Sequence, residues 1–157
     1  MFLYETFPPE RVIIDLQAED KDEVFEEMVD KFCQTTGIGS REDLLQALWD
    51  RESKMSTGIQ KGVAIPHGKI TGLKDVCGVL GISKKGIDYD ALDGQPVYIV
   101  FMLLVPQTDF EDHLIILQRL AEMLHNHKFY TDLVAQNNQN NVNGIVKKYE
   151  DIYIASE

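Results

Sequence analysis

The chain has 157 residues, of which 44% are hydrophobic and 26% are charged, and its formal net charge is −11. This length and composition are typical of a soluble globular protein with one hydrophobic core, and we expect a single domain over residues 1–157. The negative charge argues against binding to nucleic acid, and no apolar run is long enough to insert into a membrane. Residues 1–10 lack the basic and apolar segments of a secretory signal, so we expect a cytoplasmic protein.

The first third of the chain predicts one strand and two helices. Residues 12–16 are rich in β-branched side chains and predict a strand. Asp20, with Glu23 three residues later, predicts the start of a helix, and Gly37 predicts its end. Ser40 then predicts the N-cap of a second helix, whose apolar positions lie between residues 44 and 48.

The middle of the chain changes from helices to loops and strands. Glycine and proline punctuate residues 53–69, which predicts a structured loop with a short strand at 63–65. Further strands are expected at 76–82 and 97–105. The latter is apolar almost throughout, as in a strand that is covered on both faces.

The last third predicts helices. Asp109 or Asp112 is expected to open a helix whose apolar stripe includes Leu114 and Ile115, and weaker helices are expected near 129–135 and 143–149. Interspersed strands and helices predict an α/β fold with a mixed β-sheet sandwiched by helices.

The two cysteines and four histidines give no indication of a metal site. Cys33 falls on a predicted helix and Cys77 in a predicted strand, and we expect both to be buried, reduced thiols. No spacing among these residues matches a set of metal ligands, and we expect neither a metal nor a cofactor.

His67 is the best candidate for a chemical role. A neutral imidazole nitrogen is a good nucleophile, and histidine can accept and release a phosphoryl group near neutral pH. Pro66 stiffens the backbone before it, and Gly68 is expected to let a partner approach closely. Ser56 and Thr57 offer hydroxyl donors for phosphate oxygens.

Two further candidates are His113 and Arg51. His113 lies near the start of a predicted helix, where the positive end of the dipole favours an anion, although a lone histidine is more often structural. Arg51 ends the second helix and by itself would be a solvated surface arginine. His125 and His127 follow the third helix, where a cation meeting the helix dipole is the simpler interpretation.

Residues 51–69 form a more specific pattern, RESKMSTGIQKGVAIPHGK. This segment resembles the active-site segment of the mannitol/fructose-type enzyme IIA family of the sugar phosphotransferase system. The segments LDGQPV at 92–97 and VFMLLVP at 100–106, and His113-Leu114 with Leu117, also match in the right order. The resemblance therefore covers nearly the whole chain.

The resemblance implies roles for the candidate residues. His67 would be phosphorylated at Nε2 by the phosphocarrier HPr, while its Nδ1–H donates to a backbone carbonyl. His113 would stabilise the phosphoryl group, and Arg51 would supply a nearby positive charge. The family fold is a mixed sheet flanked by helices, in agreement with the predicted elements.

Within this family, the absence of a membrane transporter domain and the Pro66-His67-Gly68-Lys69 ending resemble the nitrogen-regulatory branch. The donor would then be HPr or its nitrogen-branch relative. A sugar-specific IIA subunit that donates to a IIB component remains an alternative. One departure is Gln60, where family members often have glycine, which affects the expected shape of the loop.

The sequence allows two other classes of function. In a regulatory binding module, the phosphorylation state of His67 would set the affinity for a transporter or kinase. A hydrolase using Ser56 and His67 is disfavoured, because Met55-Ser56-Thr57 lacks the glycines of a nucleophilic serine turn.

Overall fold

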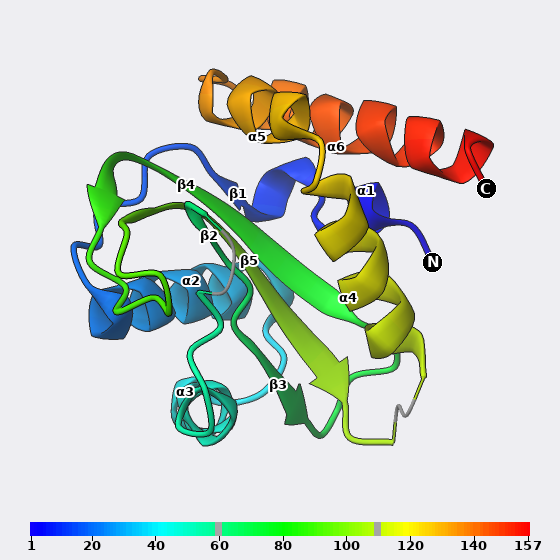
Figure 1. Cartoon of the computed structure of the whole chain (residues 1–157). Helices are drawn as coiled ribbons and strands as arrows, with labels where there is room; N and C mark the ends of the chain where they lie inside the picture. Colours follow the sequence, from blue (N-terminus) through cyan, green and yellow to red (C-terminus); the bar gives the residue numbers. More distant parts are fainter. Residues whose placement is uncertain (59–60, 109–110) are drawn as a thin grey trace.

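The computed structural model describes residues 1–58, 61–108 and 111–157 and contains helices on both faces of a sheet (Figure 1). Its elements, in chain order, are α1 (Leu3–Thr6), a 3-10 turn (Pro9–Arg11), β1 (Val12–Ile13), α2 (Lys21–Thr36), α3 (Arg41–Glu52), β2 (Val63–Ala64), β3 (His67–Ile70), β4 (Cys77–Ile87), β5 (Val97–Pro106), α4 (Asp112–Met123), α5 (His127–Val134) and α6 (Gln139–Ala155).

The sheet is mixed and is organised around β5. Its strand order is β1-β4-β5-β2, and β3 also pairs with β5. β4 runs antiparallel to β5, whereas β2 and β3 run parallel to β5, and β1 runs parallel to β4. The central strand β5 is therefore paired along both of its edges.

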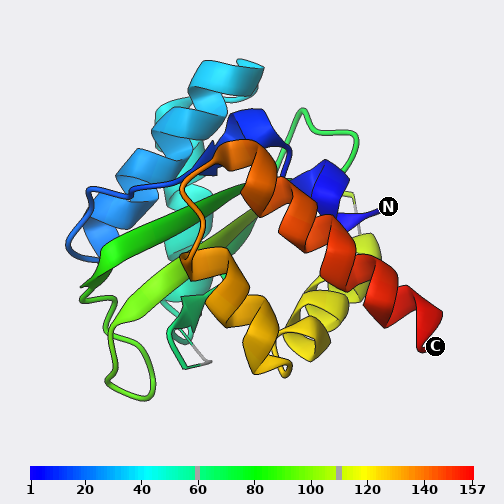
Figure 2. The same cartoon turned by 90° about the horizontal axis from the view of Figure 1, so that it is seen from above.

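Helices cover both faces of this sheet, which confirms the predicted sandwich (Figures 1 and 2). On one face, α2 and α3 enclose a core that includes Phe25, Leu48 and Met102. On the other face, α1, α4, α5 and α6 enclose a core that includes Phe101 and Phe129. Because successive strand residues point to opposite faces, the apolar run in β5 supplies both cores, as the sequence predicted.

The predicted ends of α2 and α3 are confirmed. The side chain of Asp20 accepts a hydrogen bond from the backbone N–H of Glu23, and that of Ser40 accepts from Asp43. Gly37 ends α2 with a φ of 66°, a left-handed conformation that favours glycine. These ends are predictable because each capping residue bonds to a backbone group only three or four residues away in the sequence.

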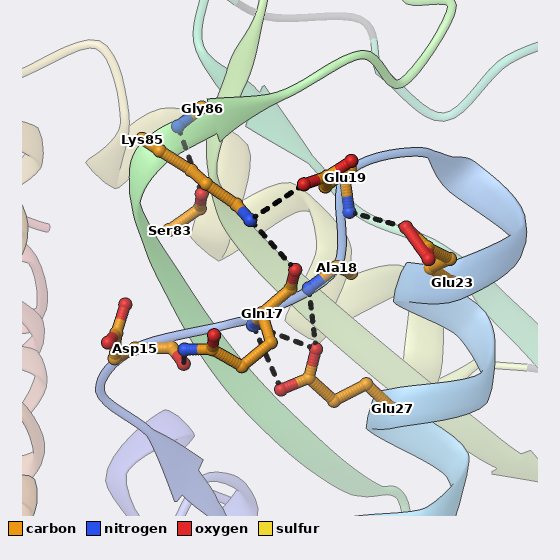
Figure 3. Close-up of polar contacts among 9 residues, drawn as sticks. All are labelled: Asp15, Gln17, Ala18, Glu19, Glu23, Glu27, Ser83, Lys85 and Gly86. Carbon is orange, nitrogen blue, oxygen red and sulfur yellow. Dashed lines mark hydrogen bonds and ion pairs between the residues drawn. The ribbon is translucent and has the colours of Figure 1, made fainter.

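The strand expected at 12–16 ends at Ile13, although the backbone N–H of Leu16 still donates to the carbonyl oxygen of Ile82 in β4 at 2.8 Å. Side chains hold the residues that follow (Figure 3). Glu27 accepts hydrogen bonds from the backbone N–H groups of Gln17, at 3.0 Å, and Ala18, at 2.9 Å. Lys85 of β4 donates to the carbonyl oxygen of Gln17 at 3.0 Å. Side chains therefore fix the chain directly after the expected strand.

The last three helices differ in detail from expectation. α4 begins at Asp112, and Asp109, the alternative start, lies outside the described residues. Leu114 and Ile115 are 57% and 54% exposed, because Ile116 and Leu120 form the face of α4 that meets the sheet. α6 is longer than predicted, since Asn138 caps its start with two backbone hydrogen bonds.

Both cysteines lie where they were expected and form no disulfide. Cys33 is in α2 and Cys77 begins β4, and each is half-buried where a buried thiol was expected. Among the described residues, no helix is both long and apolar enough to cross a membrane.

Candidate functional site

The candidate site forms where the edge of the sheet is interrupted. β2 and β3 keep one register along β5, with Ala64 opposite Val100 and His67 opposite Leu103. Pro66 lies in the gap and has no N–H to donate, although its carbonyl oxygen accepts from Leu103 N at 2.9 Å. Proline therefore divides the edge into two short strands, and His67 begins the second one. The sequence predicted a loop here because such short strands depend on their partner.

The imidazole of His67 is held in one tautomer. Its Nδ1 lies 2.8 Å from the carbonyl oxygen of Ile65. A carbonyl oxygen can only accept a hydrogen bond, so Nδ1 carries the proton and Nε2 keeps its lone pair. This contact confirms the backbone carbonyl partner that was expected for Nδ1.

The surroundings of His67 favour its neutral form. Burial lowers the pKa of His67, and the hydrogen bond to Ile65 opposes that effect. Electrostatic interactions with Arg51 and His113 lower the pKa further, the carboxylate of Glu52 raises it, and the net shift of the pKa is downward. The ring is therefore an unprotonated nucleophile near neutral pH.

Gly68 has a different role from the one expected. A Cβ atom at this position would lie 2.8 Å from both the carbonyl carbon and the oxygen of Ala47 in α3. Glycine therefore allows α3 to pack closely against β3, and it is α3, instead of an incoming partner, that approaches here. This contact sets the distance between the helix that carries Arg51 and the strand that carries His67.

Arg51, His67 and His113 line one pocket of about 550 Å³, so the structure brings these three predicted residues together. Arg51 lies in the last turn of α3, and its Nη1 donates to the carbonyl oxygen of Met55 at 2.8 Å. His113 is the second residue of α4 and is half-buried. The other residues that line the pocket are Asp43, Gln46, Ala47, Asp50, Lys54, Gly68, Lys69, Val105 and Gln107.

Ser56 and Thr57 are not among the residues that line this pocket. The Ser56 hydroxyl oxygen accepts from the backbone N–H of Gly58 at 3.2 Å. Thr57 is buried, and its hydroxyl lies 2.6 Å from Glu52 and 2.8 Å from the hydroxyl of Tyr89. The Thr57 hydroxyl is therefore engaged within the protein, whereas the Ser56 hydroxyl accepts a bond and keeps its proton to donate. Their expected role beside the phosphoryl group stays a prediction. Gln60, the departure noted in this loop, lies outside the described residues.

The sequence interpretation missed Glu52, the buried partner of Thr57. The side chain of Glu52 is 2% exposed and forms an ion pair with Lys21 at 3.0 Å. Burial alone would raise the pKa of Glu52, but hydrogen bonds from Thr57 and Lys21 outweigh it, and the pKa is lowered. A signal was present in the sequence, because Glu52 continues the buried stripe of Leu44 and Leu48 at intervals of four.

The other two histidines lie away from this pocket. His125 follows α4 and is exposed, and His127 begins α5 and stacks on Tyr130 with 5.7 Å between ring centres. Within residues 1–58, 61–108 and 111–157, no group of three or more His, Cys, Asp and Glu side chains is placed to hold a metal ion.

Comparison with known proteins identifies relatives of this chain. A nitrogen regulatory protein of Bradyrhizobium diazoefficiens is 36% identical over 116 residues, which are 74% of this chain and 75% of that protein. The fructose-specific EIIABC component of Bacillus subtilis is 29% identical over 150 residues. That alignment covers 96% of this chain but only 24% of the larger protein.

Solved structures share the fold. The crystal structure of nitrogen regulatory protein IIA-Ntr from Neisseria meningitidis has a TM-score of 0.84 at 30% identity, and the match covers 92% of this chain and 98% of that one. The crystal structure of IIA mannitol from Escherichia coli, at 17% identity, has a TM-score of 0.73 over 89% of this chain and 98% of its own.

A family model also matches most of the chain. The model described as phosphoenolpyruvate-dependent sugar phosphotransferase system, EIIA 2, matches residues 5–149 and so spans the sheet, the pocket and nearly all the helices. With the fold, the pocket and the relatives in agreement, the chain belongs to the EIIA 2 family of phosphotransfer components.

Proposed function

We propose that this protein carries a phosphoryl group on Nε2 of His67. It would receive the group from the phosphohistidine of HPr or of a nitrogen-branch HPr-like protein. The observation that carries the proposal is the 2.8 Å contact between His67 Nδ1 and the carbonyl oxygen of Ile65. Because Nδ1 is occupied as a donor, Nε2 is the nitrogen with a lone pair for the incoming phosphorus.

The transfer exchanges one phosphorus–nitrogen bond for another. The lone pair of His67 Nε2 attacks the phosphorus in line with the donor's phosphorus–nitrogen bond, and that bond breaks with its electron pair returning to the donor imidazole. The departing ring takes up a proton at the nitrogen it frees. Passing the group onward repeats the same exchange with His67 as the leaving group.

Arg51 and His113 would stabilise the phosphoryl oxygens during this exchange. Both line the pocket with His67, and both influence the charge balance of its ring. The guanidinium of Arg51 is oriented by the carbonyl oxygen of Met55, and its planar set of N–H donors suits phosphate oxygens. Positive groups fixed in place before the reaction stabilise a transferring phosphoryl group at little reorganisation cost. We assign Thr57 and Ser56 to the support of the loop.

The proposal is tested by incubating the protein with phosphoenolpyruvate, enzyme I and each candidate donor. We expect the wild-type protein and a His125→Ala control to become labelled, and a His67→Ala variant to remain unlabelled. Labelling that persists in His67→Ala would refute the assignment of the acceptor. Comparing the labelling rates with HPr and its nitrogen-branch relative identifies the donor.

The proposal has two versions, which differ in what happens to the phosphoryl group after His67 has accepted it. Relatives named nitrogen regulatory proteins favour signalling through the phosphorylation state of the protein, by binding a transporter or kinase. Relatives named fructose-specific EIIA components favour transfer to a IIB component, and IIA mannitol of Escherichia coli has been solved in complex with phosphorylated IIB mannitol. Loss of label to an added IIB protein supports the second version, and label retained with phosphorylation-dependent binding supports the first.

A further inference from the structure

A buried carboxylate lies behind the candidate site. Glu52 accepts two hydrogen bonds from Thr57, one from its backbone N–H at 2.9 Å and one from its hydroxyl at 2.6 Å. Lys21, at the start of α2, forms an ion pair with Glu52 at 3.0 Å and lies over the ring of Tyr89. The end of α3, the start of α2 and the loop after α3 therefore meet at one charged group.

A continuous series of hydrogen bonds leads from this carboxylate to the ring of His67. The carbonyl oxygen of Thr57 accepts from the backbone N–H of Ile65 at 3.1 Å. The carbonyl oxygen of Ile65 then accepts from Nδ1 of His67 at 2.8 Å. Glu52 fixes Thr57, Thr57 fixes Ile65, and Ile65 fixes the tautomer and orientation of the imidazole.

The orientation of Arg51 depends on the same hydrogen bonds between Glu52 and Thr57. It precedes Glu52 directly, and its guanidinium donates to the carbonyl oxygen of Met55, which lies two residues before Thr57. The loop between Glu52 and Thr57 is closed by the two hydrogen bonds described above. Movement of Thr57 would therefore shift both the carbonyl that orients Arg51 and the carbonyl that orients His67.

Stability alone gives little reason to place a carboxylate here. Glu52 occupies the buried stripe of α3 that Leu44 and Leu48 begin. A buried ion pair is often no more stabilising than apolar side chains of similar size, because both charges lose their hydration. An apolar residue at this position could not accept the two hydrogen bonds from Thr57, so the carboxylate serves the geometry of the loop.

We infer that Glu52 and Thr57 are positioning residues for phosphoryl transfer, which hold the ring of His67 and the guanidinium of Arg51 in register through one hydrogen-bonded loop. This inference rests on the proposed role of His67 as the phosphoryl acceptor. It gives Thr57 a function through its neighbours, in place of direct contact with the phosphoryl group.

The test compares Thr57→Val with Thr57→Ser. Valine keeps the shape of threonine and removes the hydroxyl that bonds to Glu52, whereas serine restores it. Thr6→Val is a matched control, because Thr6 is a buried threonine of α1 whose hydroxyl donates to the carbonyl oxygen of Phe2. Two readouts are taken: the rate of labelling by phosphorylated donor at saturation, and the tautomer of the His67 ring from its ¹⁵N chemical shifts.

In Thr57→Val, we expect labelling to slow by about tenfold, the factor that a typical buried hydrogen bond contributes. The His67 ring should show a mixture of tautomers, while the donor concentration at half-saturation stays unchanged. Thr57→Ser should recover the wild-type tautomer and most of the rate, and Thr6→Val should match the wild type in both. A Thr57→Val variant with wild-type rate and tautomer would overturn the inference.

A Glu52→Gln variant keeps the test decisive if Thr57→Val does not fold. The amide matches the size of the carboxylate but has one acceptor oxygen for the two donors of Thr57. We expect the same mixture of tautomers and a slower rate, and wild-type values for both would refute the role of Glu52. Because the tautomer is measured without a phosphoryl donor, failure of this inference is distinguishable from failure of His67 to become labelled.

Discussion

At the scale of single residues, the chemistry of the site follows from one backbone carbonyl. Ile65 lies beside the proline gap, and its carbonyl oxygen accepts from Nδ1 of His67. This contact leaves the lone pair on Nε2, while burial and the neighbouring Arg51 and His113 favour the neutral ring. The orientation and the nucleophilicity of His67 therefore have separate physical origins.

The lowered pKa of His67 predicts how labelling depends on pH. The imidazole stays unprotonated above its folded-state pKa, so the rate should be constant near neutral pH and fall in acid with a midpoint below about 6.5. To check this, the midpoint of an NMR pH titration of the His67 ring is compared with the midpoint of the labelling rate over the same pH range. A midpoint at or above that of an unperturbed imidazole would contradict the electrostatic description.

The lowered pKa of His67 also makes the stability of the fold depend on pH. The unfolded chain binds a proton at His67 at higher pH than the folded chain does, because the folded-state pKa is lowered. The contribution of His67 to stability is therefore present above the unfolded pKa and is lost as the pH falls through the folded pKa.

The sequence pattern was sufficient to predict that Arg51, His67 and His113 share a site, but not how the loop is held. Functional side chains in a specific spacing are visible in a sequence. The hydrogen bonds of Thr57 are not, because they depend on Glu52 being turned inward at the end of α3. The amphipathic stripe that ends in Glu52 was the one local indication of this.

At the scale of secondary-structure elements, the site depends on the contact between α3 and β3. Arg51 and His67 belong to different elements, and Gly68 brings these elements together at Ala47. Because a protein interior is closely packed, a single additional methyl group at this contact must displace one element relative to the other.

A Gly68→Ala substitution should separate the two elements. Its Cβ would lie 2.8 Å from the backbone of Ala47, so we expect a loss of about 1–3 kcal/mol in the free energy of unfolding and slower labelling of His67. Urea denaturation and the labelling assay measure the two effects.

Gly144→Ala is the matched control for this change. Gly144 lies within α6, where an added Cβ meets nothing within 4 Å, so alanine should raise stability by about 0.5–1 kcal/mol. Labelling should be unaffected by this control. If Gly68→Ala behaved like Gly144→Ala, close packing of α3 on β3 would not be what positions the site.

Helix ends were easier to predict than strand ends. The caps of α2 and α3 bond to residues within the same turn, so Asp20 and Ser40 mark them in the sequence. β1 and β3 pair with strands more than 30 residues away, and their lengths depend on those partners. Local signals determine the former, and tertiary pairing determines the latter.

At the scale of the whole molecule, the sandwich was predictable because β5 is apolar on both of its faces. A strand of this kind must be covered twice, and the amphipathic helices predicted before and after it supply the two layers. The full lining of the pocket was harder to predict from the sequence. It is made from α3, β3, β5 and α4, which only the fold brings together.

The net charge of −11 predicts a dependence of the reaction on salt. If the donor presents a basic face, opposite charges increase the rate of encounter, and salt screens this attraction. Between about 50 and 500 mM NaCl, we expect the second-order rate constant for labelling to fall by roughly tenfold. The rate at saturating donor should change little. A second-order rate constant that is independent of salt would show that charge does not guide the encounter.

The interrupted strand beside His67 also affects how the protein behaves at high concentration. Open sheet edges expose backbone groups that can pair with another molecule, and long flat edges promote aggregation. Here the edge consists of the two-residue β2 and the four-residue β3, and both backbone groups of Ile65 between them are already bonded, to Thr57 and to His67. The arrangement that fixes the tautomer of His67 therefore also leaves little edge on which a second sheet could grow.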